Sequence, residues 1–200
     1  MHNPQSCIKN VSGVILAGGK SIRYGKNKAM EKINGTPLIE IVIRVIQPLF
    51  EELVLITNTP DEYSSLGLPM YEDLIKGLGP LGGIHTALTA IGNDTGFFVA
   101  CDMPYLNREL IRYMTGLRDD FDVVIPKISW KIEPLHALYT KGCLPAIGEL
   151  IESRTYKIAE FLPEVSVRYV DEDEILAFDP ESRCFFNVNM PQELRRIMNS

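Results

Sequence analysis

The sequence has no long hydrophobic run, and its apolar segments are far too short to span a bilayer. Its first ten residues lack the apolar core of a secretory signal peptide. The cysteines lie far apart with no CxxC pair, which argues against a zinc site and a compact disulfide framework; they are Cys7, Cys101, Cys143 and Cys184. We therefore expect a cytoplasmic protein with free thiols.

Positive charge is scarce and mostly scattered. The 20 Lys and Arg residues are outnumbered by 26 Asp and Glu residues, so the formal charge is −6. Because nucleic-acid phosphates require a concentrated basic field, we do not expect a broad nucleic-acid surface. The one basic stretch, residues 20–32, is large enough for a small phosphorylated ligand. The length, the 46% hydrophobic content and the absence of repeats indicate one soluble domain over residues 1–200.

Short apolar runs alternate with segments of helical periodicity. The expected strands are residues 11–16, 53–57, 97–100 and 123–125, and the expected helices are 37–47, 82–91 and 107–115, the last capped by Asn107. This alternation predicts a doubly wound α/β fold with a mostly parallel sheet between two helical layers. The later chain predicts strands at 132–139 and 165–170, helices at 144–152 and 191–198, and a solvated acidic loop at 171–174.

A glycine-rich turn follows the first expected strand, in the segment LAGGKSIRYGKNK of residues 16–28. Gly18 and Gly19 have no side chains to keep a ligand from the backbone, and the amides of such a turn can bind an anion. Arg23 and Lys28 add positive charge suited to a triphosphate. The spacing matches neither GxxxxGK[ST] nor GxGxxG. The alternative is an ordinary glycine-rich loop with solvated basic residues.

Asp102 ends an apolar strand shortly before Pro104, which cannot continue a ladder of hydrogen bonds. Ligands of such sheets bind beyond the carboxyl ends of the strands, so this carboxylate is expected at the binding edge. Mg²⁺ prefers a few carboxylates together with phosphate oxygens, which makes Asp102 a candidate metal ligand. A helix cap is its alternative. His136 lies alone among apolar residues and is interpreted as a satisfied core histidine.

The segment LAGGKSIRYGKNKA resembles the LAGGxSxRMGxDKA signature of the molybdenum cofactor guanylyltransferases, which belong to a superfamily with sugar-nucleotide and cytidylyl enzymes. Further blocks resemble that family in the same order: GPLGGI (79–84), FVACDMPY (98–105), EPLHALY (133–139) and FNVNMPQEL (186–194). The resemblance implies a Rossmann-like three-layer sandwich of the nucleotide-diphospho-sugar-transferase type. Tyr24, Asn27 and Met190 depart from the pattern, where Met, Asp and Thr are usual.

The resemblance also assigns roles to individual residues. It implies Lys28, Arg23 and Asp102 as catalytic residues, with Asp102 holding magnesium. The implied nucleotide-binding residues are Leu16, Ala17, Gly18, Gly19, Lys28, Thr57, Asp73 and Asp102, with Asn58 as an alternative to Thr57. The acceptor-binding candidates are Gly82, Asn187 and Asn189. For Gly82, phosphate binding at a helix N-terminus and close helix–sheet packing both explain the small residue.

The implied reaction is in-line attack of the phosphate of molybdopterin on the α-phosphorus of GTP, with release of pyrophosphate. A phosphate nucleophile is already anionic near neutral pH, so no general base is needed. Gly18-Gly19 favours GTP, because the cytidylyl relatives typically carry LAAG. A cytidylyltransferase, a sugar-nucleotide pyrophosphorylase and a non-catalytic GTP or pterin carrier remain alternatives. Molybdenum-cofactor insertion proteins and acceptor molybdoenzymes are further expected partners, without nucleic acid or membrane.

Overall fold

The computed structural model describes residues 7–18 and 27–188. In this part of the chain, the strands of the main sheet follow the order β10-β7-β9-β6-β1-β4-β5, and β8 pairs with β7. Their bounds are β1 Ile8–Leu16, β4 Phe50–Ile56, β5 Met70–Tyr71, β6 Thr95–Ala100, β7 Val123–Ile128, β8 Lys131–Ile132, β9 His136–Thr140 and β10 Val167–Asp171. A small antiparallel pair joins β2 (Lys32–Ile33) to β3 (Thr36–Pro37).

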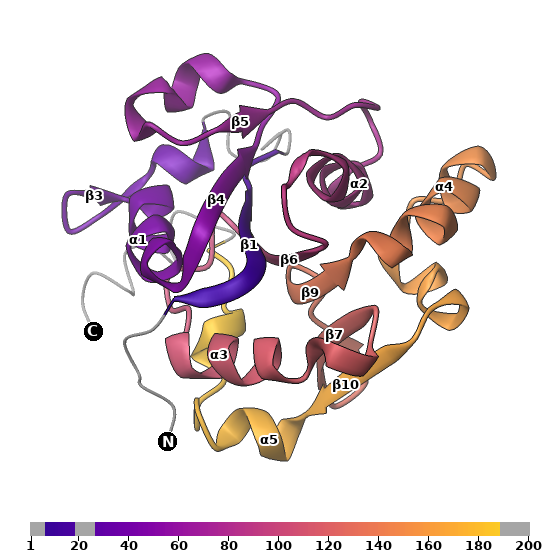
Figure 1. Ribbon diagram of the computed structural model, residues 1–200. Coiled ribbons are helices and arrows are strands. Elements are labelled where there is room, and N and C mark those ends of the chain that lie inside the picture. The colour runs from indigo at the N-terminus through magenta and orange to yellow at the C-terminus, as the bar shows by residue number, and fades with distance from the viewer. Residues whose placement is uncertain (1–6, 19–26, 189–200) are drawn as a thin grey trace.

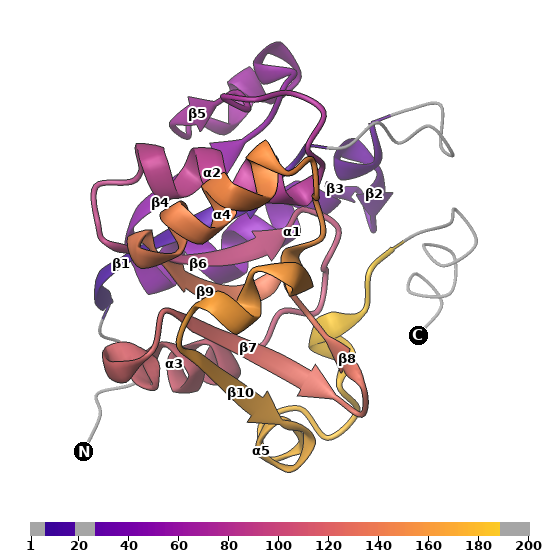
Figure 2. The ribbon, with the colours of Figure 1, turned by 90° about the vertical axis from the view of Figure 1, so that its right-hand side faces the viewer.

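The sheet is mostly parallel, as the alternation of strands and helices predicts. β1 pairs in parallel with both β4 and β6, and β10 pairs in parallel with β7. Two strands are exceptions: β9 lies antiparallel to β6 on one side and to β7 on the other, and β8 lies antiparallel to β7. The expected strand at 132–139 is divided: a turn at 133–135 separates β8 from β9. Figure 2 shows β7 and β10 side by side, with α5 at the end of β10.

Helices cover both faces of the sheet (Figure 1). Their bounds are α1 Leu38–Ile46, α2 Pro80–Ala90, α3 Arg108–Gly116, α4 Leu144–Glu152 and α5 Glu172–Leu176. Side chains alternate along each strand, so Ile15 packs into the core that contains α1 and α3, while Val14 packs into the core that contains α2 and α4. The predicted three-layer α/β sandwich is confirmed.

Polar side chains determine where two of these helices begin. Asn107 caps α3, since its side-chain oxygen accepts hydrogen bonds from the backbone amides of Glu109 (2.9 Å) and Leu110 (3.0 Å). The predicted acidic loop at 171–174 is wrong. Asp171 and Glu174 form a capping box that starts α5 there. The helix expected at 191–198 lies outside the described residues.

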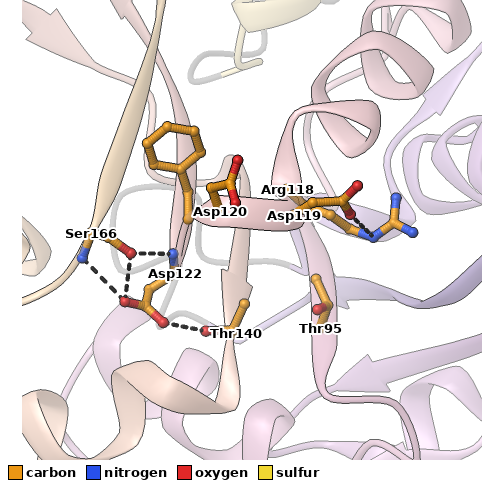
Figure 3. Close-up of a pocket in the computed structure, with 8 residues that line it drawn as sticks. Thr95, Arg118, Asp119, Asp120, Asp122, Thr140 and Ser166 are labelled. Atoms are coloured by element: carbon orange, nitrogen blue, oxygen red, sulfur yellow. Dashed lines mark hydrogen bonds and ion pairs between the residues drawn. The ribbon is translucent and has the colours of Figure 1, made fainter.

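At the amino-terminal edge of the sheet, Asp122 joins three segments of the chain (Figure 3). Its carboxylate accepts hydrogen bonds from the Ser166 hydroxyl (2.7 Å), the Ser166 amide (3.1 Å) and the Thr140 hydroxyl (3.0 Å). Hydrogen bonding from Ser166 is the largest cause that lowers the pKa of Asp122. A cavity of about 400 Å³ adjoins these residues. The three hydrogen bonds to this carboxylate indicate a structural role at this edge.

No helix within the described ranges has the length and apolar character needed to cross a membrane.

Candidate active site

Three neighbouring parallel strands end level with one another. Leu16, the last residue of β1, pairs with Ile56 of β4 on one side and with Ala100 of β6 on the other. Backbone bonds continue past the ends, from the Ala17 amide to the Ile56 carbonyl (2.9 Å) and from the Cys101 amide to the Leu16 carbonyl (3.1 Å). The segments 17–18, 57–58 and 101–102 therefore emerge side by side at the carboxyl edge.

A cavity of about 1130 Å³ opens at this edge. Its lining includes several residues expected from the sequence, namely Leu16, Ala17, Gly18, Lys28, Asn58, Asp73, Asp102 and Asn187. It also includes residues that the sequence did not indicate, among them Glu62, Tyr63, Lys76 and Leu135. The predicted binding edge and the cavity thus coincide.

Lys28 and Asp102 form an ion pair in this cavity. The Lys28 Nζ lies 2.5 Å from the Asp102 Oδ2, with exposed side-chain fractions of 14% and 19%. This short contact joins the last residue of the glycine-rich segment to Asp102, the second residue after β6. Asp102 does not cap a helix, because Asn107 caps α3. Its carboxylate therefore lies where the sequence predicts, on the same side as the glycine-rich turn.

The second carboxylate oxygen of Asp102 is available to bind a metal ion. Oδ1 is buried and has no hydrogen-bond partner among the described residues. A buried carboxylate oxygen without a donor is costly unless a ligand satisfies it, and oxygen is the donor that Mg²⁺ prefers. The described ranges contain no group of three or more His, Cys, Asp or Glu residues placed to hold a metal. The donors present fit a cation whose other ligands come from substrate or water.

Asn58 and Asp73 form the side of the cavity beside β4 and β5. The Asn58 amide nitrogen donates to the Asp73 carboxylate (2.7 Å), and the Asp73 backbone amide donates to the Asn58 side-chain oxygen (3.1 Å). Thr57 is 1% exposed and does not line the cavity. Of the two positions left open by the sequence, Asn58 faces the cavity and Thr57 lies in the core.

The glycines of α2 serve close packing. A Cβ on Gly82 would lie 3.1 Å from the Leu78 Cβ and 3.2 Å from the Ile75 carbonyl oxygen, and one on Gly83 would lie 3.1 Å from a Leu16 methyl group. Gly82 is buried and does not line the cavity, whereas Gly83 does. The structure therefore favours the packing explanation for Gly82.

The described chain ends beside Asp102. The Val188 amide donates to the Asp102 backbone carbonyl (3.0 Å), and this bond brings Asn187 to the cavity. The Asn187 side chain donates to the Phe185 carbonyl (3.4 Å). Five of the positions singled out from the sequence lie outside the described residues: Gly19, Arg23, Tyr24, Asn189 and Met190.

Two further titratable groups near the edge are held in their neutral forms. Burial, followed by the charge of Asp102, raises the pKa of the Cys101 thiol to about 12. Burial lowers the pKa of His136 to about 3. His136 packs edge-on against Phe97 and Phe185, with ring centroids 5.4 and 5.1 Å apart. It is a core histidine, as expected, but it is not satisfied, because neither ring nitrogen has a hydrogen-bond partner among the described residues.

This arrangement defines a class of protein. A mostly parallel α/β sheet presents a glycine-containing turn, a lysine and a strand-end carboxylate around one large cavity. The carboxyl edge of such a sheet is where phosphorylated ligands bind. Neither a buried neutral histidine nor a protonated thiol supplies a nucleophile here. The fold and site are those of a nucleotidyltransferase.

Comparison with known proteins identifies the family. The family described as "MobA-like NTP transferase domain" matches residues 13–166. A protein of Pelotomaculum thermopropionicum named "Probable molybdenum cofactor guanylyltransferase" is 39% identical over 92% of this chain and 89% of its own length. The "Molybdenum cofactor guanylyltransferase" of Desulfosudis oleivorans is 34% identical, with 93% of each protein covered. The chain belongs to the MobA-like NTP transferase family.

A solved structure supports the same relationship. The molybdopterin-guanine dinucleotide biosynthesis protein A of Archaeoglobus fulgidus has a TM-score of 0.81 and 29% identity to this chain, with 94% of this chain and 97% of the other covered. The sequence resemblance to the molybdenum cofactor guanylyltransferases is therefore confirmed.

Proposed function

We propose that this protein transfers GMP from GTP to the phosphate of molybdopterin, releasing pyrophosphate and forming the guanine dinucleotide form of the cofactor. The contact that carries the proposal is the 2.5 Å pair between Lys28 and Asp102, inside a cavity at the carboxyl edge of the sheet. The names of the relatives and the order of the sequence blocks support the choice of substrates. We propose that residues 1–200 act as one domain.

The two sides of the cavity suit the two ends of GTP. Gly18 and Lys28 provide a backbone turn and a cation on the side of β1, which suits the phosphates. Asp73 and Asn58 lie on the side of β4 and β5, where a carboxylate and an amide can accept and donate hydrogen bonds at the edge of a guanine. In this proposal Asn58 replaces Thr57 as the nucleotide contact from β4. Asn187 lies on the acceptor side.

The chemical step requires little acid–base chemistry from the protein. The acceptor phosphate is anionic near neutral pH, because its second pKa lies near about 6, so it attacks the α-phosphorus without a general base. The new bond joins an acceptor oxygen to that phosphorus, and the bond to the β-phosphate oxygen breaks with its electron pair on pyrophosphate. Lys28 stabilises the charge that develops there, and the cavity positions the two reactants.

We propose magnesium as the metal, held by Asp102 through the unpartnered Oδ1 and by oxygens of the substrate phosphates. When bound, it supplies charge neutralisation on the triphosphate. Arg23, Gly19 and Asn189 are retained as proposed phosphate and acceptor contacts on the strength of the sequence resemblance.

The direct test is a product assay. The protein is incubated with MgCl₂, phosphorylated molybdopterin and either GTP or CTP, and the products are identified by mass spectrometry while pyrophosphate is quantified. We expect the guanine dinucleotide and stoichiometric pyrophosphate with GTP. Product with CTP alone would indicate a cytidylyltransferase, and product with a sugar phosphate in place of the pterin would indicate a sugar-nucleotide pyrophosphorylase. GTP binding without pyrophosphate release would indicate a carrier.

A further inference from the structure

Asn27 is the residue directly before Lys28, and its side chain contacts three groups. Its amide nitrogen donates a short hydrogen bond to the Glu62 carboxylate. Its side-chain oxygen accepts from the Tyr63 hydroxyl (3.1 Å) and from the Ala29 backbone amide (3.0 Å). The Ala29 bond caps the 3₁₀ turn η1 (Lys28–Met30), which begins with the active-site lysine.

The orientation of the Asn27 amide follows from the chemistry of its partners. The Ala29 amide can only donate, so it meets the side-chain oxygen of Asn27. An ionised Glu62 carboxylate can only accept, so it meets the nitrogen. An aspartate at position 27 would keep the first contact and would place a second carboxylate against Glu62. The related signature has Asp at this position, whereas this chain pairs an amide with Glu62.

The contacts tie Lys28 to a fixed part of the core. Tyr63 and Glu62 belong to η3 (Pro60–Leu66), the 3₁₀ segment between β4 and β5. Tyr63 is 2% exposed and packs in the same core as Ala29. Burial, then the neighbouring Cys101 thiol, raises the pKa of Tyr63 to about 12, so its hydroxyl remains a donor at neutral pH. The hydrogen bond from the buried Tyr63 therefore anchors Asn27, the residue directly before Lys28.

We propose that Asn27 is a positioning residue for Lys28 and that its side-chain amide is suited to the Glu62 carboxylate opposite it. By fixing the turn that begins with Lys28, the Asn27 amide holds the lysine ammonium at the phosphate side of the cavity. The inference rests on the proposed function in that it takes GTP as the ligand. It predicts that the charge at position 27 and the charge at position 62 are coupled. An added carboxylate at position 27 harms GTP use only while the Glu62 side chain lies opposite it.

The experiment is a double-mutant cycle of the wild type, Asn27→Asp, Glu62→Gln and the double variant. The dissociation constant for Mg-GTP is measured by calorimetry, and kcat and KM for GTP are measured by pyrophosphate release. Because Glu62 is solvent-exposed, we expect a moderate effect, with Asn27→Asp lowering kcat/KM about tenfold. In the Glu62→Gln background the same change should cost less than about threefold, because the new amide at position 62 can donate to the new carboxylate at position 27.

Asn10→Asp is the matched control. Asn10 is exposed near the start of β1, at the opposite edge of the sheet, so this variant adds the same charge away from the cavity. Thermal unfolding of all variants is recorded in parallel. An Asn27→Asp effect of equal size in the wild type and in the Glu62→Gln background would overturn the proposal. A second outcome would also overturn it: Asn27→Asp lowers the unfolding midpoint and the double variant restores that midpoint, while kcat/KM and GTP affinity stay unchanged in every variant. The contact between positions 27 and 62 would then serve stability alone.

The binding measurement separates this inference from the proposed function. A wild type that binds Mg-GTP but forms no pterin product would defeat the proposed function, and the cycle of GTP affinities would still decide the coupling of Asn27 and Glu62. Product formation without such coupling would defeat the inference alone. A wild type without affinity for GTP would defeat both.

Discussion

His136 makes the stability of this protein depend on pH in one direction. The ring is fully buried between aromatic side chains, and burial lowers the pKa of His136 from 6.5 to about 3. The unfolded chain binds a proton on this residue below about pH 6.5, whereas the folded protein resists it until about pH 3. The stabilising contribution is therefore present above pH 6.5 and is lost as the pH falls through this window.

The expected size follows from that difference. A pH of 5 lies about 1.5 units below the pKa of 6.5 that the imidazole has in the unfolded chain, and each unit corresponds to about 1.36 kcal/mol. Acidification from pH 7.5 to 5 should therefore remove about 2 kcal/mol through His136. This is a large part of the stability of an ordinary domain.

Urea unfolding of the wild type and of His136→Leu at pH 7.5, 6.5, 5.5 and 5.0 measures this contribution. The other titrating groups are common to both proteins, so the difference between their pH profiles isolates the histidine. The wild type should lose about 2 kcal/mol more than the variant across this range. Profiles that run parallel would refute the account of a neutral, desolvated imidazole in the folded protein.

The remaining predictions concern the two edges of the sheet. Lys28→Ala should lower kcat at least about a hundredfold with a small change in unfolding midpoint, and full activity would refute its role. Asp102→Asn should remove most of the Mg²⁺ dependence of GTP binding, measured by calorimetry with and without the metal. Asn58→Ala should raise the KM for GTP about tenfold or less, because Asp73 loses its side-chain donor. Asp122→Ala should lower the free energy of unfolding by about 2 kcal/mol at pH 7 while kcat is unchanged, as the substitution removes three hydrogen bonds to a carboxylate. Because the pKa of Asp122 is lowered in the folded state, this difference should shrink as the pH falls below about 4.

The sequence predicts the site best where a position follows from one strand. Asp102 comes after a buried run and shortly before a proline, so its place at the carboxyl edge follows from local pattern. Thr57 and Asn58 differ by one residue, and a single step of side-chain alternation decides which one faces the core. The order of residues at the end of β4 does not reveal that step.

Contacts between distant segments are harder to predict. Nothing near Asn27 indicates that Glu62 and Tyr63 will meet it, because they lie in a short 3₁₀ segment after the next strand of the sheet. The antiparallel direction of β9 cannot be predicted from the sequence either, because the pattern of apolar residues does not show in which direction a strand runs. Asp171 and Glu174 have the spacing of a capping box, which could have indicated the start of α5, but from the sequence the acidic run is interpreted as a solvated loop.

The reversed direction of strand β9 determines which residues line one part of the cavity. Because β9 runs against its neighbours, its first residues reach the ligand edge, and the turn at 133–135 brings Leu135 into the same lining as Asn58 and Asp73. One side of the cavity thus comes from Asn58 and Asp73, and the turn before β9 adds Leu135 to the lining. An insertion in that turn would change the lining at Leu135 and leave the bonded pair of Asn58 and Asp73 in place.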